Sequence, residues 1–151
     1  MLQNVPEKLR PQDALKRILL GEKMLYNRSC PGGGWNAGNP LVYGVPGVPR
    51  FGPTAWALLA LRHHKDRSAN REGIEWLEQN YKSIRSPGSL ALAQLCLRVY
   101  GRTATPIESA ISDFYRSNQF LQNIPVTAWV LLALSSLPDW LESSQQAENA
   151  L

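Results

Sequence analysis

The chain has 151 residues, 44% of them hydrophobic and 19% charged, and its formal net charge is +4. This length and composition predict a single globular domain with its own core. The basic residues are scattered rather than gathered in a stripe with exposed aromatic side chains, so nucleic-acid binding is not expected, and no apolar run approaches the roughly 20 residues of a transmembrane helix.

Proline marks the starts of the expected helices. Each of five prolines stands at the head of a helix-like run, where a missing N–H leaves no hydrogen bond unmade: Pro11, Pro53, Pro87, Pro106 and Pro125. The strand signal is weak, because no hairpin dipeptide lies between two alternating segments. The sequence therefore predicts an all-α fold with one long loop.

Three segments are apolar on one side only, and they cover residues 12–26, 72–82 and 106–117. Their apolar positions recur at helical spacing, which is typical of helices that cover a core and expose the opposite face. These positions are Leu15, Ile18, Leu19 and Leu25 in the first segment, Ile74, Leu77 and Tyr81 in the second, and Ile107, Ala110, Ile111 and Phe114 in the third. We expect them to form outer helices.

Three strongly apolar runs follow these segments at nearly equal intervals. Residues 54–61 read TAWALLAL, residues 90–97 read LALAQLCL, and residues 127–134 read TAWVLLAL. The runs are apolar nearly all round, so each is expected to form a helix that is buried on most sides. The chain is thus predicted to hold three repeated helix pairs, buried inner and amphipathic outer, as in a short helical solenoid or part of an α/α toroid.

The long loop at 36–52 interrupts the first pair. It carries Asn36, Asn39, Tyr43 and Arg50 among glycines and prolines, so it is polar and stiffened. Long ordered loops of compact domains are often functional. The alternative is that this loop only caps the end of the helical array.

One domain is predicted over residues 1–142, and the polar residues 143–151 are expected to form a disordered tail. Cys30 and Cys96 are far apart and fit neither a disulfide framework nor a zinc-site spacing, which favours a reducing compartment. The first twelve residues lack the apolar stretch of a signal peptide. We therefore expect a cytoplasmic protein, with peripheral membrane association left open.

A spaced motif around the glycine-rich stretch resembles the QW repeat. It consists of Gly21, Met24, Leu25, Ser29, Gly33 and Trp35, with Met24 in place of an aromatic residue and Ser29 in place of glutamine. A second, partial copy begins at Gly73. On these residues the chain, over roughly residues 12–137, resembles the prenyltransferase/squalene oxidase repeat family, which includes squalene–hopene cyclases and protein prenyltransferase β-subunits. The resemblance implies an α/α toroid of which this chain would supply about half, and hence a homo-oligomer or a separate complementary half.

The stretch GGGWNAGN at 32–39 is expected to be a structural turn. A phosphate-binding loop requires a strand before its glycines and a helix directly after them, whereas here a helix precedes and a proline-rich loop follows. The glycines would let the backbone turn sharply, and Trp35 would pack over the helix ends, as the QW resemblance implies.

The catalytic motifs of the resembled family are missing. Its cyclases protonate an alkene with a DxDD acid, but the four aspartates here are isolated: Asp13, Asp66, Asp113 and Asp139. Its β-subunits hold zinc with an Asp-x-Cys pair, but Arg28 and Gln94 stand two residues before the cysteines. No catalytic residue, metal ion or cofactor is therefore assigned.

Aromatic residues of the inner helices are the candidates for ligand binding. Trp56 and Trp129 occupy equivalent positions, with Leu92 between them, and would line a cavity for an apolar ligand or else pack in the core. Gln94 stands where the other runs have leucine, so it faces a cavity or bonds a neighbouring helix end. The candidate ligand-binding residues are Trp35, Asn36, Asn39, Tyr43, Trp56, Gln94 and Trp129.

These observations predict a non-catalytic toroid-type repeat module that binds an apolar, isoprenoid-like ligand or a protein partner. The alternative is half of an isoprenoid-active enzyme, resembling a terpene cyclase or prenyltransferase, whose catalytic residues lie outside this chain. A third interpretation is a solenoid scaffold with no cavity, which would bind peptides on a concave surface.

Overall fold

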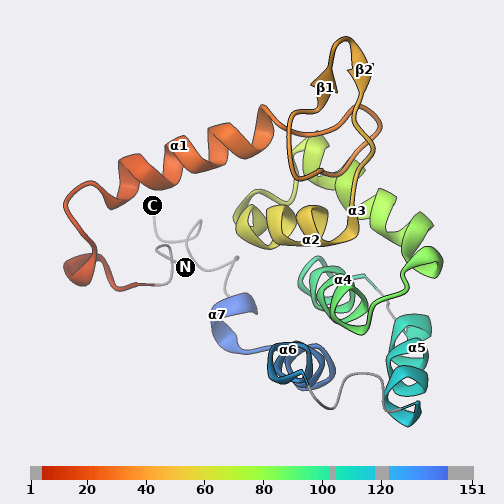
Figure 1. Ribbon diagram of the computed structural model, residues 1–151. Helices are drawn as coiled ribbons and strands as arrows, with labels where there is room; N and C mark the ends of the chain where they lie inside the picture. Colours follow the sequence, from red (N-terminus) through yellow and green to blue (C-terminus); the bar gives the residue numbers. More distant parts are fainter. Residues whose placement is uncertain (1–4, 103–104, 118–122, 143–151) are drawn as a thin grey trace.

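The computed structural model describes residues 5–102, 105–117 and 123–142 (Figure 1). Most of this part is helical, which confirms the all-α class. The α-helices are α1 (Ala14–Tyr26), α2 (Phe51–Ala60), α3 (Ser68–Asn80), α4 (Pro87–Val99), α5 (Thr105–Arg116), α6 (Ile124–Leu134) and α7 (Asp139–Glu142). Short 3-10 helices are η2 (Glu7–Leu9), η3 (Arg62–His64) and η4 (Tyr81–Ser83). Within the described ranges, every helix is too short or too polar to cross a membrane.

Pro53, Pro87, Pro106 and Pro125 lie in the first turns of helices, as predicted, whereas Pro11 precedes the start of α1 by three residues. Two of these prolines follow a capping side chain. Pro87 and Pro125 lie in the first turns of α4 and α6. The side chains of Ser86 and Asn123 accept hydrogen bonds from backbone N–H groups of these turns. Such caps satisfy donors that have no partner within the helix, so both inner helices have well-defined beginnings.

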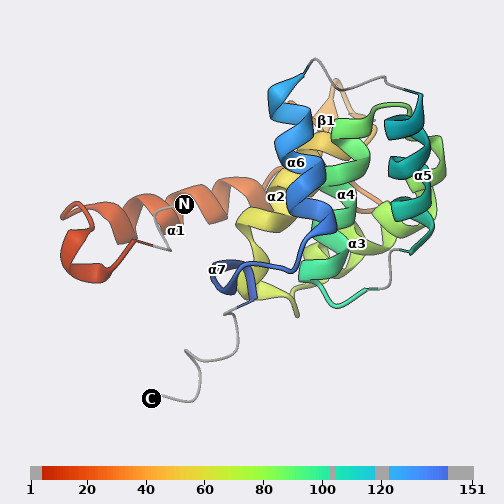
Figure 2. The ribbon, with the colours of Figure 1, turned by 90° about the horizontal axis from the view of Figure 1, so that it is seen from below.

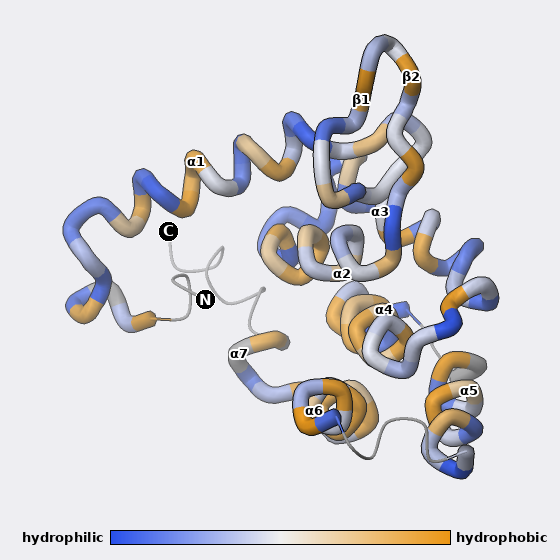
Figure 3. Tube along the Cα trace, in the orientation of Figure 1, coloured by the Kyte–Doolittle hydropathy of each residue, from blue (hydrophilic) through white to orange (hydrophobic). Residues whose placement is uncertain are grey.

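Helix α4 is the centre of the molecule. In Figure 1, α2, α4 and α6 follow a curved line, with α3 and α5 on its convex side, and α4 packs against all four of these helices. Every residue from Leu90 to Leu97 is buried, and α4 and α6 consist mostly of hydrophobic residues (Figure 3). The predicted double layer is therefore present over α2 to α6.

Helix α6 departs from the prediction that each apolar run is buried on most sides. Val130 and Ala133 are buried, but Ile124 and Leu131 are exposed, Leu131 to 65%. A helix of a repeat array is covered only by its neighbours. Because α6 lies at the end of the curved row in Figure 1, one flank stays open.

Helix α1 does not pair with α2, contrary to the prediction. It extends away from the other helices (Figure 2), and its predicted core positions Leu15 and Leu19 are 63% and 56% exposed. Ala14 is the only buried residue of α1. The amphipathic pattern correctly predicted a helix here. The long connection between α1 and α2, however, places most of α1 too far from the core to pack against it.

A small hairpin in the long loop was not predicted. β1 (Leu41–Val42) pairs with β2 (Val45–Pro46) in antiparallel orientation. Tyr43 and Gly44 form its turn with φ values of 51° and 80°, as a two-residue hairpin turn requires. Strands of two residues are too short for an alternating pattern, so the sequence contained no signal for them.

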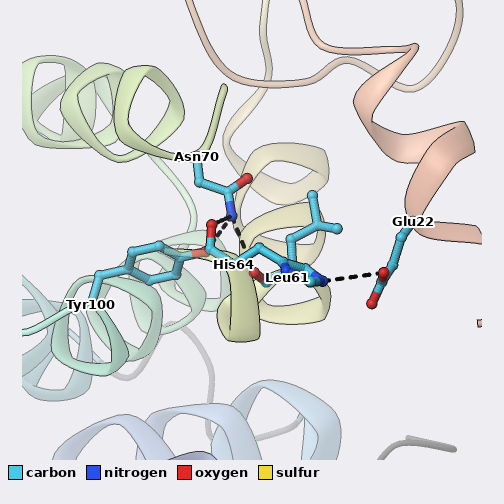
Figure 4. A network of polar contacts seen from close by, with 5 residues as sticks. All are labelled: Glu22, Leu61, His64, Asn70 and Tyr100. Atoms are coloured by element: carbon cyan, nitrogen blue, oxygen red, sulfur yellow. Dashed lines mark hydrogen bonds and ion pairs between the residues drawn. The ribbon is translucent and has the colours of Figure 1, made fainter. Parts of the chain in front are cut away.

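A buried polar network joins α2, α3 and α4, and a partly exposed contact ties α1 to it (Figure 4). The side-chain amide of Asn70, on α3, donates to the carbonyl oxygens of Leu61 and His64 at 3.1 and 2.8 Å. The Tyr100 hydroxyl, just after α4, donates to the Leu58 carbonyl oxygen in α2 at 2.9 Å. His64 then contacts the Glu22 carboxylate of α1 at 3.2 Å.

Cations at the ends of α2 and α4 donate hydrogen bonds to backbone carbonyl oxygens at the end of the next inner helix. The Lys65 ammonium, just beyond α2, donates to the Val99 carbonyl oxygen of α4 at 2.6 Å. The Arg98 guanidinium of α4 donates to the carbonyl oxygens of Ala133 and Ser135, at the end of α6. These carbonyls have no partners within their own helices, and the helix dipole favours a positive charge there.

The network makes the fold sensitive to alkaline pH. Burial raises the pKa of Tyr100 above its ordinary value of 10.0, so above about pH 10 the unfolded chain loses a proton that the folded chain keeps. The free energy of unfolding should therefore fall as the pH rises through this range. Tyr100→Phe should flatten this decline and, at pH 7, lower the free energy of unfolding by about 1 kcal/mol for the lost hydrogen bond.

Urea denaturation between pH 7 and 11 measures both effects. Burial also raises the pKa of Cys96 above 9.0, so part of the decline should persist in the Tyr100→Phe variant. An equally steep decline in the variant and the wild type would show that Tyr100 keeps no proton on folding.

Candidate functional site

The glycine-rich turn brings its backbone unusually close to α2 and α3. Gly32, Gly33 and Gly34 all have positive φ values, of 84°, 97° and 76°. A Cβ atom on Gly33 would lie 2.5 Å from the Glu72 carbonyl oxygen, and one on Gly34 would lie 2.9 Å from Thr54 Oγ1. The turn therefore needs glycine for its conformation and, at two positions, for space.

Trp35 joins the end of α1 to α2 and α3. Its indole Nε1–H donates to the Leu25 carbonyl oxygen at 2.8 Å, near the end of α1. Its backbone N–H donates to Thr54 Oγ1 at 2.9 Å, and this hydroxyl donates back to the Trp35 carbonyl oxygen. The ring lies against Gly73 of α3, where an added Cβ would be 2.8 Å from Cζ3. These contacts confirm that Trp35 packs over helix ends in a structural turn.

Alanine substitutions in the turn separate backbone strain from crowding. Gly32→Ala should cost about 1 kcal/mol, because its Cβ meets no atom within 4 Å and only the positive φ opposes it. Gly33→Ala should cost about 1–3 kcal/mol more, because the backbone of Glu72 must move. Chemical denaturation of the two variants measures the difference, and equal losses would contradict the close approach of the turn to α3.

A pocket of about 270 Å³ lies between the end of α1, the turn and α2. We call it the α1/α2 pocket. It is lined by Met24, Leu25, Arg28, Trp35, Asn36, Ala37, Gly38, Pro53, Trp56, Ala57 and Ala60. The lining is mostly apolar and contains one charged residue, Arg28, an arrangement typical of sites for small apolar molecules.

Three predicted ligand residues line this pocket, and a fourth extends it. Trp35, Asn36 and Trp56 come together there. The Trp56 ring meets the half-buried Trp129 ring edge to face, with centroids 4.9 Å apart and planes at 81°. Trp56 is nonetheless 47% exposed. An apolar surface therefore runs from the pocket to α6.

The other three predicted residues lie elsewhere. Tyr43 is fully exposed at the hairpin turn, and Asn39 contacts the Asn36 amide only through its carbonyl oxygen, at 3.1 Å. Gln94 is completely buried, and its amide donates to the Glu108 carboxylate in the first turn of α5 at 2.7 Å. Of the two readings of Gln94, the bond to a neighbouring helix end is the observed one.

The two cysteines are structural. Both are buried, and burial raises the pKa of each thiol. Since the thiolate is the reactive form, neither is poised as a nucleophile. Among the described residues there is no group of three or more His, Cys, Asp or Glu side chains that could hold a metal ion.

Several residues that line the pocket were not predicted from the sequence, although the sequence contained a usable signal for two of them. Ala60 follows Trp56 by one helical turn and so shares its face. Met24 holds the aromatic position of the QW-like motif. Arg28 and Pro53 enter the site only through the path of the backbone between α1 and α2.

Comparison of the chain with protein-family models, with curated proteins and with solved structures gives no match. Membership of the QW-repeat family therefore stays a prediction. The function is accordingly inferred from the α1/α2 pocket and the exposed tryptophan beside it.

Proposed function

We propose that this chain is a non-catalytic, toroid-type repeat module that binds an apolar, isoprenoid-like ligand in the α1/α2 pocket and along Trp56 and Trp129. The observation that carries the proposal is the exposure of nearly half of the Trp56 side chain at the pocket. Covering apolar surface stabilises a complex by roughly 25 cal/mol per Å². A bound apolar chain would gain this energy by lying across both rings.

The presence of a pocket favours a ligand-binding module over a peptide scaffold. The volume of about 270 Å³ lies just below the roughly 300 Å³ at which small-molecule sites begin. The contact between Trp56 and Trp129 adds an open apolar surface next to it. A ligand longer than the pocket therefore has a surface along which to continue.

The alternative, half of an isoprenoid-active enzyme, is supported by the open flank of α6. Leu131 and Leu134 are exposed on this helix, where further helices would pack in a longer array. On this alternative the catalytic groups belong to the missing half, and the α1/α2 pocket would form part of a larger cavity.

Farnesol, an uncharged isoprenoid alcohol, is the probe for the first proposal. Trp56→Ala should weaken its binding about tenfold, because a large apolar contact is lost. Tyr43→Ala removes a predicted residue that lies away from the pocket, and it should leave the affinity unchanged. Equilibrium dialysis with labelled farnesol measures the affinities, and equal effects of the two substitutions would contradict binding at the pocket.

We also propose that the open flank of α6 associates with a second copy or with a complementary half, because an apolar flank of this kind is typical of an interface. Light scattering should show a dimer for the wild type. Leu131→Glu should return it to a monomer, since a buried unpaired carboxylate costs several kcal/mol. Val48→Glu, at an exposed apolar residue of the long loop, is the control and should not dissociate the dimer.

A further inference from the structure

A larger groove lies outside the α1/α2 pocket, between the α3–α4 connection and α5. Both elements lie on the convex side of the curved row in Figure 1. The groove has a volume of about 550 Å³, well within the roughly 300–1,000 Å³ of small-molecule sites. We call it the outer groove. Neither the proposed function nor the predicted site residues account for it.

The floor of the outer groove is apolar. Ile84 and Leu90 are buried and belong to the main core, and Phe114 of α5 packs against that core while lining the groove. These side chains offer no hydrogen-bonding group. The floor therefore suits a hydrocarbon chain.

One wall of the groove is cationic, and one of its cations is held in position. Lys82 and Arg85 both line the groove and are exposed. The Arg85 Nη1 group donates to the carbonyl oxygens of Lys82 and Ile84, at 2.8 and 3.3 Å. These bonds anchor the guanidinium through one nitrogen and, among the described residues, leave its other N–H groups without a hydrogen bond. A carboxylate can accept from such a fork.

The opposite wall does not cancel this charge. Asp113 lines the groove, but it already has a cation beside it, Arg116, at 3.6 Å. Two cations, Lys82 and Arg85, thus line the groove against the single carboxylate of Asp113, and the rim keeps a positive balance. An anionic head group is favoured there, and a cationic one is disfavoured.

We infer that the outer groove binds a single-chain amphiphilic carboxylate, such as a fatty acid, with its chain on the Ile84–Leu90–Phe114 floor and its head group on Arg85. A peptide of a partner protein is less suited. The nine residues that line the groove are far fewer than the roughly 20–30 that one side of a stable protein interface provides.

Dodecanoate is the probe, titrated by calorimetry below its micellar concentration. It should bind one site per chain, whereas dodecyltrimethylammonium, with the same chain and the opposite charge, should bind at least about tenfold more weakly. Arg85→Gln should weaken dodecanoate binding about tenfold, as expected for the loss of a charge-assisted hydrogen bond. Arg17→Gln, at an exposed arginine of α1, is the matched control and should leave the affinity unchanged.

Trp56→Ala distinguishes this site from the α1/α2 pocket and should not change dodecanoate binding. Loss of dodecanoate affinity in Trp56→Ala but not in Arg85→Gln would overturn the inference, because the probe would then occupy the other pocket. Equal binding of the two amphiphiles, or equal effects of Arg85→Gln and Arg17→Gln, would overturn it as well. Because Arg85 is exposed, Arg85→Gln should keep the wild-type thermal unfolding temperature.

Discussion

The buried indole of Trp35 is the contact on which the arrangement of the α1/α2 pocket depends. Its side chain holds the last turn of α1 through the indole N–H and fills the space that Gly73 leaves on α3. Its backbone N–H and carbonyl oxygen exchange hydrogen bonds with the Thr54 hydroxyl of α2. Other contacts also reach α1: the Tyr26 ring packs against Arg67 and His64, and the Glu22 carboxylate contacts His64. Water screens the partly exposed Glu22–His64 pair and lowers its contribution. Trp35 is therefore the residue that both holds the end of α1 and lines the pocket.

The rest of the molecule follows from how a row of helices buries its members. Helix α4 has neighbours on every side and is buried along its apolar run, whereas α6 has an open flank. The last helix of a repeat array has no neighbour on one side, so its apolar surface stays open there unless its outer face is polar. The exposed residues of α6 follow from its place at the end of the row, and two of them, Leu131 and Leu134, line a pocket of about 480 Å³ that α6 forms with α5.

Sequence patterns predicted the elements better than their placement. Apolar runs and amphipathic patterns located α2 to α6. For the polar Gln94 the sequence left two alternatives, a cavity and a bond to a neighbouring helix end, and the structure shows the bond. The same periodicity indicated an apolar face on α1, but a pattern of one helix does not say whether a partner lies within reach. Trp56, which the repeats singled out together with Trp129, lines the α1/α2 pocket, whereas Trp129 contacts Trp56 outside its lining. The side of the pocket that α1 forms depends on the backbone path through three glycines, and no periodicity in the sequence predicts that path.

The cations that bond the ends of the inner helices have a direction, because each reaches from its own helix to the end of the next one. Lys65 serves α4 and Arg98 serves α6, but no lysine, arginine or histidine follows Arg116 in the sequence. Among the described residues that follow α6, 135–142, there is no cation that could bond the end of a helix placed beside it. A chain that extends this row must bring its own counter-charge for the carbonyl end of its first helix, so the array is polar and its two ends are not interchangeable.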